Sequence, residues 1–213
     1  MTFHAERFVS LESGDHLSGE EFHRRYSARP DIKKAELVEG IVWVGGRVRA
    51  QEHAEPNAAM AGWLGFYAAY APDVRVGLHA TVILDDRNEV QPDVLAWLPR
   101  LAGIRLTYDG YLEGAPHLIV EIAATSASYD LHSKKEAYRR NGVCEYVVWR
   151  VLDRAIDWFH LQEGEYVRVE PGADGFVESA NFAGLRLHIP SMLAGDLAAV
   201  LATLPEPDER ERL

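Results

Sequence analysis

The order of apolar and polar positions along the chain predicts a mixed α/β fold, beginning with one helix and a strand pair. A capping box at Ser18, with apolar residues at helical spacing, predicts a helix over residues 19–27. The segment 35–44 predicts two strands around a turn at Glu39–Gly40. Residues 53–70 are rich in alanine, leucine and aromatic side chains, which predicts a buried helix.

The second part of the chain alternates short β-type runs with two helical segments. Strands are predicted within residues 74–84, 90–98, 118–122, 145–151, 155–161 and 165–170, and helices over 130–141 and from Pro190 to about Leu204. The order helix, strands, helix, strand favours a mixed β-sheet with a helix on each face.

Length and composition fit one domain without disulfide or membrane support. The chain has 213 residues, so we expect a single domain over residues 1–204 and a charged tail over 205–213. A single cysteine, Cys144, excludes an intrachain disulfide framework and a cysteine-based zinc cluster. The longest apolar stretch, residues 58–71, is shorter than a membrane span, and no signal-type segment opens the chain. We therefore expect a soluble cytoplasmic protein without membrane contact.

The charge balance restricts the possible partners. The chain carries 22 lysines and arginines against 33 acidic residues, a formal net charge of −11. This argues against nucleic-acid binding through a broad basic face. It leaves open a metal enzyme that acts on phosphates, because a bound divalent cation reverses the local sign of the charge.

Two carboxylates lie in predicted strands. Glu121 stands inside the apolar run 118–122, and Asp93 follows Pro92 at the start of another strand. A buried carboxylate without a partner is costly, so each needs a reason for its position. If the strands are neighbours, the two acids form an oxygen-rich site suited to Mg²⁺ or Mn²⁺. The alternative is that each is separately ion-paired or lies at a solvated strand end.

A polar stripe follows on the next helix. Asp130, Lys134 and Tyr138 recur every four residues and therefore share one helix face. A lysine there can orient a water molecule or neutralise charge on a phosphate. Lys135 points about 100° away round the helix and is the weaker candidate. The alternative is an ordinary ion pair on a wet helix surface.

These residues, with the sequence around them, resemble the Uma-type family of restriction endonucleases, a bacterial group in the PD-(D/E)xK nuclease superfamily. The resemblance spans residues 18–160, and its motifs are the segment Glu36–Gly40, His53, Pro92-Asp93, Glu121, the Asp130–Lys134–Tyr138 stripe and Gly142–Tyr146.

The resemblance implies a restriction-endonuclease-like fold, a mixed β-sheet flanked by helices. It also implies that Asp93, Glu121 and the carbonyl of Ile122 bind the metal, and that Lys134 completes the catalytic set. Superfamily lysines usually stand two residues after the glutamate, where this chain has Ala123. The family pattern instead carries the lysine on the following helix.

Three further residues have two interpretations each. Glu36 is a candidate third carboxylate for a second metal, although we favour an exposed strand acid. His53 can stand near the site, although we favour a helix-end histidine bonded to the backbone. Trp43 lies in a predicted strand, where tryptophan is usually part of the core.

The leading hypothesis is a metal-dependent endonuclease that uses Mg²⁺ or Mn²⁺ to hydrolyse DNA phosphodiester bonds. The sequence does not separate DNA from RNA as the substrate. Strands rich in tryptophan, valine and tyrosine near 145–161 favour a homodimer, as does the habit of restriction-type folds. The rival hypothesis is a non-catalytic nuclease-fold module that serves protein assembly.

Overall fold

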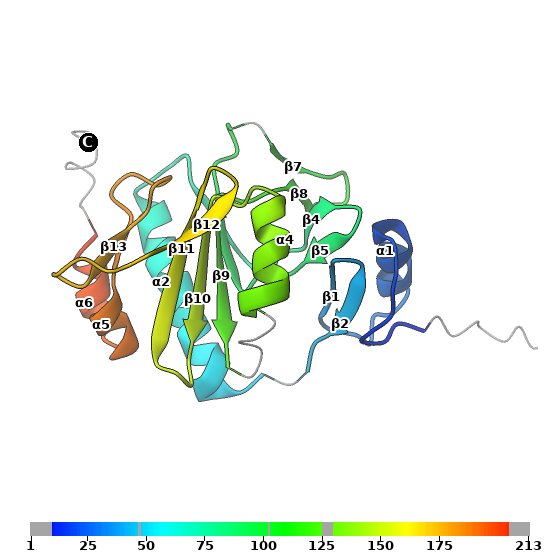
Figure 1. Cartoon of the computed structure of the whole chain (residues 1–213), viewed down its shortest axis with the longest axis horizontal. Helices are drawn as coiled ribbons and strands as arrows, with labels where there is room; N and C mark the ends of the chain where they lie inside the picture. Colours follow the sequence, from blue (N-terminus) through cyan, green and yellow to red (C-terminus); the bar gives the residue numbers. More distant parts are fainter. Residues whose placement is uncertain (1–9, 47, 102, 125–129, 205–213) are drawn as a thin grey trace, which may run out of the picture.

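The computed structural model describes residues 10–46, 48–101, 103–124 and 130–204 (Figure 1). The helical elements are α1 (Gly19–Ser27), the π-helical turn η1 (Ala50–Ala54), α2 (Glu55–Ala69), the π-helical turn η2 (Asp130–Lys134), α4 (Lys135–Arg140), α5 (Ile189–Leu193) and α6 (Leu197–Leu201). The strands are β1 (Ala35–Val38), β2 (Ile41–Val44), β3 (Arg75–Leu78), β4 (Val82–Asp85), β5 (Asn88–Val90), β6 (Val94–Trp97), β7 (Ile104–Leu106), β8 (Leu112–Gly114), β9 (Leu118–Ala123), β10 (Glu145–Arg150), β11 (Ala155–Gln162), β12 (Glu165–Val169), β13 (Phe176–Glu178) and β14 (Arg186–His188).

The longer strands form two six-stranded mixed sheets. The first sheet has the order β2-β1-β5-β4-β8-β7 and the second has the order β12-β11-β10-β9-β6-β3. The connections β3–β4, β5–β6 and β8–β9 each carry the chain from one sheet to the other. Pro92 and Pro116 lie in two of these connections, where a residue without an amide hydrogen interrupts a hydrogen-bond ladder.

The second sheet is covered on both faces (Figure 1). Leu118, Val120 and Ile122 of β9 pack toward α2, whereas Ile119 and Ala123 share the opposite face with Tyr138 of α4. Because side chains alternate along a strand, Glu121 lies on the α4 face with Ile119 and Ala123. The prediction of an α/β fold with a mixed sheet flanked by helices is confirmed.

Several local predictions are confirmed by the structure. The helix over 19–27 is α1, and the Ser18 side chain accepts a hydrogen bond from the Glu21 amide at 3.3 Å. The turn at Glu39–Gly40 joins β1 to β2, with φ angles of 56° and 78°. These left-handed angles match the twist of a two-residue hairpin.

Other predictions differ from the structure. The helix predicted from Pro190 to Leu204 is two short helices, because the chain turns at Gly195 with a φ of 76°. The helix predicted over 130–141 begins with a wider π-helical turn at η2. Trp43 was expected in the core, yet its side chain is 40% exposed because β2 is the edge strand of the first sheet.

The part of the chain that follows residue 160, where the resemblance ends, is fixed to the second sheet by a buried carboxylate. Glu145, at the start of β10, is fully buried, and its Oε2 accepts a hydrogen bond from Nε1 of Trp158 at 2.8 Å. Its Oε1 accepts hydrogen bonds from Ser179 and Asn181. The segment that leads into β14 and α5 is therefore fastened to the end of the sheet.

The predicted division into one domain over 1–204 and a tail stays a prediction, and residues 205–213 lie outside the described residues. Among the described helices, each is too short or too polar to cross a membrane.

Candidate active site

Asp93 and Glu121 are brought together at the junction of the two sheets. β6 runs antiparallel to β9 and pairs Val94 with Val120, which places Asp93 beside Glu121. Oδ2 of Asp93 accepts a hydrogen bond from the Ile122 amide at 2.8 Å, in a position where the ladder would otherwise continue. Each side chain is buried to 2% exposure. The two strands, whose adjacency the sequence left open, are therefore neighbours.

Asp93 is surrounded by groups that favour its charged form. His53 Nε2 lies 3.2 Å from Oδ2, and Lys34 Nζ lies 3.6 Å from Oδ1. Burial alone would raise the pKa of Asp93. The His53 hydrogen bond and the Lys34 charge oppose it and, with the Ile122 amide, hold this pKa well below its usual value. Asp93 is therefore a carboxylate at neutral pH.

Glu121 is held by the helix that follows it. Its Oε1 accepts hydrogen bonds from Lys134 Nζ and from the Tyr138 hydroxyl, both at 2.8 Å. Lys134 belongs to η2 and Tyr138 to α4, so the stripe predicted from their spacing faces β9. Asp130 begins η2, and its side chain lies outside the described residues.

Glu36 joins the same cluster from the first sheet. Its Oε1 lies 2.9 Å from Lys134 Nζ and accepts a hydrogen bond from the Gln91 amide at 2.8 Å. The favoured interpretation of Glu36 as an exposed strand acid is wrong: its exposure is 5%. The reason is that β1 lies inside the first sheet, between β2 and β5, and directs Glu36 toward the junction.

The carboxylates and the lysine line one cavity of about 210 Å³, which also contacts Lys34, Trp43 and Ile122. The backbone-bonded interpretation of His53 is wrong as well, since its ring faces Asp93 and lines this cavity. Lys134 is 2% exposed, so the alternative of an ion pair on a wet helix surface does not hold. A stripe of charged residues on a helix usually faces solvent, but this one faces two buried acids.

Sequence reasoning missed Lys34 and His79. His79 Nδ1 lies 3.7 Å from Asp93 Oδ1, and its Nε2 lies 3.1 Å from the Asn57 amide nitrogen. A signal for Lys34 was present, because residues two apart on an extended segment share a face and Lys34 precedes Glu36 by two. His79 lies in the β3–β4 connection, whose path no local pattern gives.

The donors fit a hard divalent cation by their chemistry. Asp93 Oδ1 is buried and has no hydrogen-bond partner among the described residues. Glu36, Glu121 and Ile122 line the same cavity, and carboxylate and carbonyl oxygens are the ligands of Mg²⁺ and Mn²⁺. As they stand, no three described His, Cys, Asp or Glu side chains form a metal cluster. Lys134 and Tyr138 already donate to Oε1 of Glu121, so a cation at this oxygen would compete with both donors.

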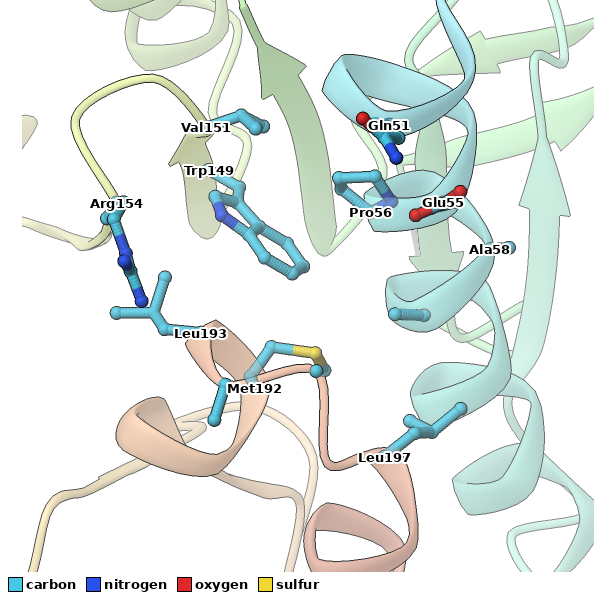
Figure 2. Close-up of a pocket in the computed structure, with 13 residues that line it drawn as sticks. Gln51, Glu55, Pro56, Ala58, Trp149, Val151, Arg154, Met192, Leu193 and Leu197 are labelled. Carbon is cyan, nitrogen blue, oxygen red and sulfur yellow. The ribbon is translucent and has the colours of Figure 1, made fainter.

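A second cavity, of about 560 Å³, lies on the opposite face of the second sheet. Figure 2 shows Trp149 at the end of β10 facing Pro56 of α2, with Met192 and Leu197 closing the other side. It contains none of the candidate site residues. The polar cluster and this apolar cavity are thus separate features.

Two comparisons with known proteins bear on this geometry. The sequence model of the Uma2 family, described as "Putative restriction endonuclease", matches residues 20–190. The chain belongs to the Uma2 family. The resemblance in the sequence ends at residue 160, but the family match continues to residue 190. It therefore includes the segment around Asn181 that is hydrogen-bonded to Glu145.

A solved structure has a similar fold. It is described as a "putative nuclease belonging to DUF820 from Anabaena variabilis ATCC 29413". The superposition has a TM-score of 0.61 with 16% sequence identity, and covers 76% of this chain and 90% of that chain. No curated protein matches the sequence.

We expect Lys134→Met to destabilise the fold strongly. Its ammonium compensates Glu36 and Glu121 in a buried site, and removing one partner of a buried ion pair costs about 3–5 kcal/mol. Urea unfolding measures this loss. Lys135→Met is the matched control: Lys135 lies over the Phe159 ring, a contact worth roughly 1 kcal/mol. Equal losses in the two variants would contradict the compensating role of Lys134.

Proposed function

We propose that this Uma2 family protein is an endonuclease that hydrolyses DNA phosphodiester bonds with the help of Mg²⁺ or Mn²⁺. The observation that carries the proposal is that Glu36, Asp93, Glu121 and Lys134, from separate elements of the fold, line one cavity. Burying three carboxylates and an ammonium costs free energy, so their convergence is better explained by chemistry than by stability.

Each residue has a role in this proposal. Asp93, Glu121 and the Ile122 carbonyl would hold the cation, and Glu36 is the accessory carboxylate. When bound, the cation polarises the phosphate and lowers the pKa of a bound water. Lys134 contributes positive charge at the cavity wall, where charge develops on the phosphate during hydrolysis.

Tyr138 is a positioning residue in this proposal. Its hydroxyl donates to Glu121 Oε1, and its ring is fully buried against Tyr146. A packed tyrosine fixes the side-chain orientation of the carboxylate, as the groups that support a metal ligand generally do.

One observation favours the alternative, a non-catalytic module that keeps this fold for protein assembly. Glu121 and Glu36 are both ion-paired with Lys134, so the cluster is electrostatically satisfied without a metal. RNA remains a second possible substrate, since a metal-held phosphate is common to both nucleic acids. We also propose the cytoplasm as the location of the activity.

We expect Mg²⁺ or Mn²⁺ to raise the melting temperature of the wild type. A ligand at a hundred times its Kd stabilises by about 2.7 kcal/mol, which is a shift of roughly 5–10 °C for a domain of this size. Asp93→Asn removes the shift, because a carboxylate ligand is lost. Asp109→Asn, at an exposed carboxylate, should keep it. A shift that survives Asp93→Asn contradicts a site at Asp93.

Cleavage of labelled DNA tests Lys134 directly. Lys134→Ala should lower metal-dependent cleavage by about a hundredfold or more, the usual effect of removing one charge-stabilising group. Lys135→Ala should retain cleavage. Circular dichroism and the metal-induced melting shift establish that the Lys134 variant is folded and still binds metal. Equal activities in the two variants refute the assignment, and a wild type that cleaves neither DNA nor RNA with either metal supports the assembly module.

We propose further that the protein is a homodimer. The strands on which this prediction rested lie inside the second sheet, where β10 and β11 are paired on both sides. The edges of this sheet are β12 and β3, and Val167 of β12 is 46% exposed. Light scattering at micromolar concentration should give twice the chain mass of 23.8 kDa. A single species at the chain mass would exclude the dimer.

A further inference from the structure

The cavity that contains Glu121 opens into a larger cleft of about 380 Å³. Lys34, Gly45, His53 and Asp93 line both spaces, so these residues mark the place where one passes into the other. Glu36, Glu121 and Lys134 line the smaller space but not the larger one. The larger cleft is therefore an extension of the candidate site rather than a second site.

The walls of this cleft carry two cations and two carboxylates, in a chain whose net charge is −11. Lys34 and Arg49 are the cations, and Glu52 and Asp93 are the carboxylates. An acidic protein that binds a phosphate chain needs cations at the places where the phosphates lie.

Lys34 differs from the other cations in and beside this cleft in its contacts. Arg49 donates to Glu52 at 2.8 Å, and in the adjoining cavity Lys134 lies between Glu36 and Glu121. The Lys34 ammonium is 3.6 Å from Asp93 Oδ1 and makes no hydrogen bond to the described residues. Its side chain is 33% exposed, so a ligand in the cleft can reach it. A lysine ammonium has three donors and suits a phosphate as a point charge.

We propose that Lys34 binds a phosphate of the nucleic-acid strand adjacent to the phosphate that is cleaved. The inner cavity, lined by Glu121 and Lys134, takes the cleaved phosphate, and the outer cleft takes its neighbour. The inference rests on the proposed function for the identity of the ligand. It adds a strand-positioning residue that does not contact the reacting atoms.

Lys33 provides a matched control. It is the preceding residue in the chain and has the same charge, but its side chain is exposed and its Nζ donates to the Pro30 carbonyl at 3.1 Å. It does not line the cleft. Variants of Lys33 and Lys34 have the same net charge and differ in where the charge is lost.

The test measures binding without cleavage. Wild type, Lys34→Met and Lys33→Met are titrated in EDTA against a fluorescent oligonucleotide, single-stranded and duplex, at several salt concentrations. We expect Lys34→Met to raise the Kd about tenfold and to reduce the slope of log K against log salt by about one, the effect of losing one phosphate contact. Lys33→Met should stay within twofold of wild type. Lys34→Gln, which keeps a polar group near Asp93, serves if the methionine variant does not fold.

Three results would overturn the proposal: a Kd and salt slope unchanged in Lys34→Met, equal weakening in Lys33→Met, or no binding by the wild type at low salt. The same samples separate this inference from the proposed function. Loss of binding in Lys34→Met with no cleavage by the wild type in Mg²⁺ or Mn²⁺ supports the phosphate site and rejects hydrolysis. Cleavage by the wild type with unchanged binding in Lys34→Met supports hydrolysis and rejects the phosphate site at Lys34.

Discussion

The candidate site depends on one buried ammonium between two carboxylates. Lys134 Nζ lies 2.9 Å from Glu36 and 2.8 Å from Glu121, and each carboxylate comes from a different sheet. Without the Lys134 charge, Glu36 and Glu121 would be two carboxylates buried side by side, which is costly in free energy. The ion pairs thus join β1, β9 and η2, and they give the junction of the sheets its polar centre.

The junction itself follows from the way the chain changes sheets. Asp93 stands immediately after Pro92, where the chain leaves β5 for β6, and the Pro92 carbonyl accepts a hydrogen bond from the His79 amide. The Ile122 amide donates to the Asp93 carboxylate rather than to a strand carbonyl. Where the chain changes sheets the ladder is interrupted, and backbone amides left without a strand carbonyl are satisfied by side chains. Glu36 likewise accepts a hydrogen bond from the Gln91 amide. The acids are therefore both structural partners of the crossing and candidates for chemistry.

The sequence predicts those parts of the site that depend on local pattern. The strand pattern placed Asp93 and Glu121 in two strands and left open whether these are neighbours, and helical spacing placed Lys134 and Tyr138 on one stripe. The inward position of Glu36 was not predictable, because it depends on β1 pairing with β5 far along the chain. Burial of Lys134 was missed for a related reason: a stripe of charges has the same spacing whether it faces water or a buried acid.

A site shared by two sheets is complete only after both sheets have folded. Glu36 and Lys134 are far apart in sequence, and contacts between such distant segments form late in folding because loop closure must come first. A nascent chain that has folded only one sheet lacks part of the cluster. Under the proposed function, hydrolytic competence therefore arrives together with the completed tertiary structure, and a half-folded chain lacks it.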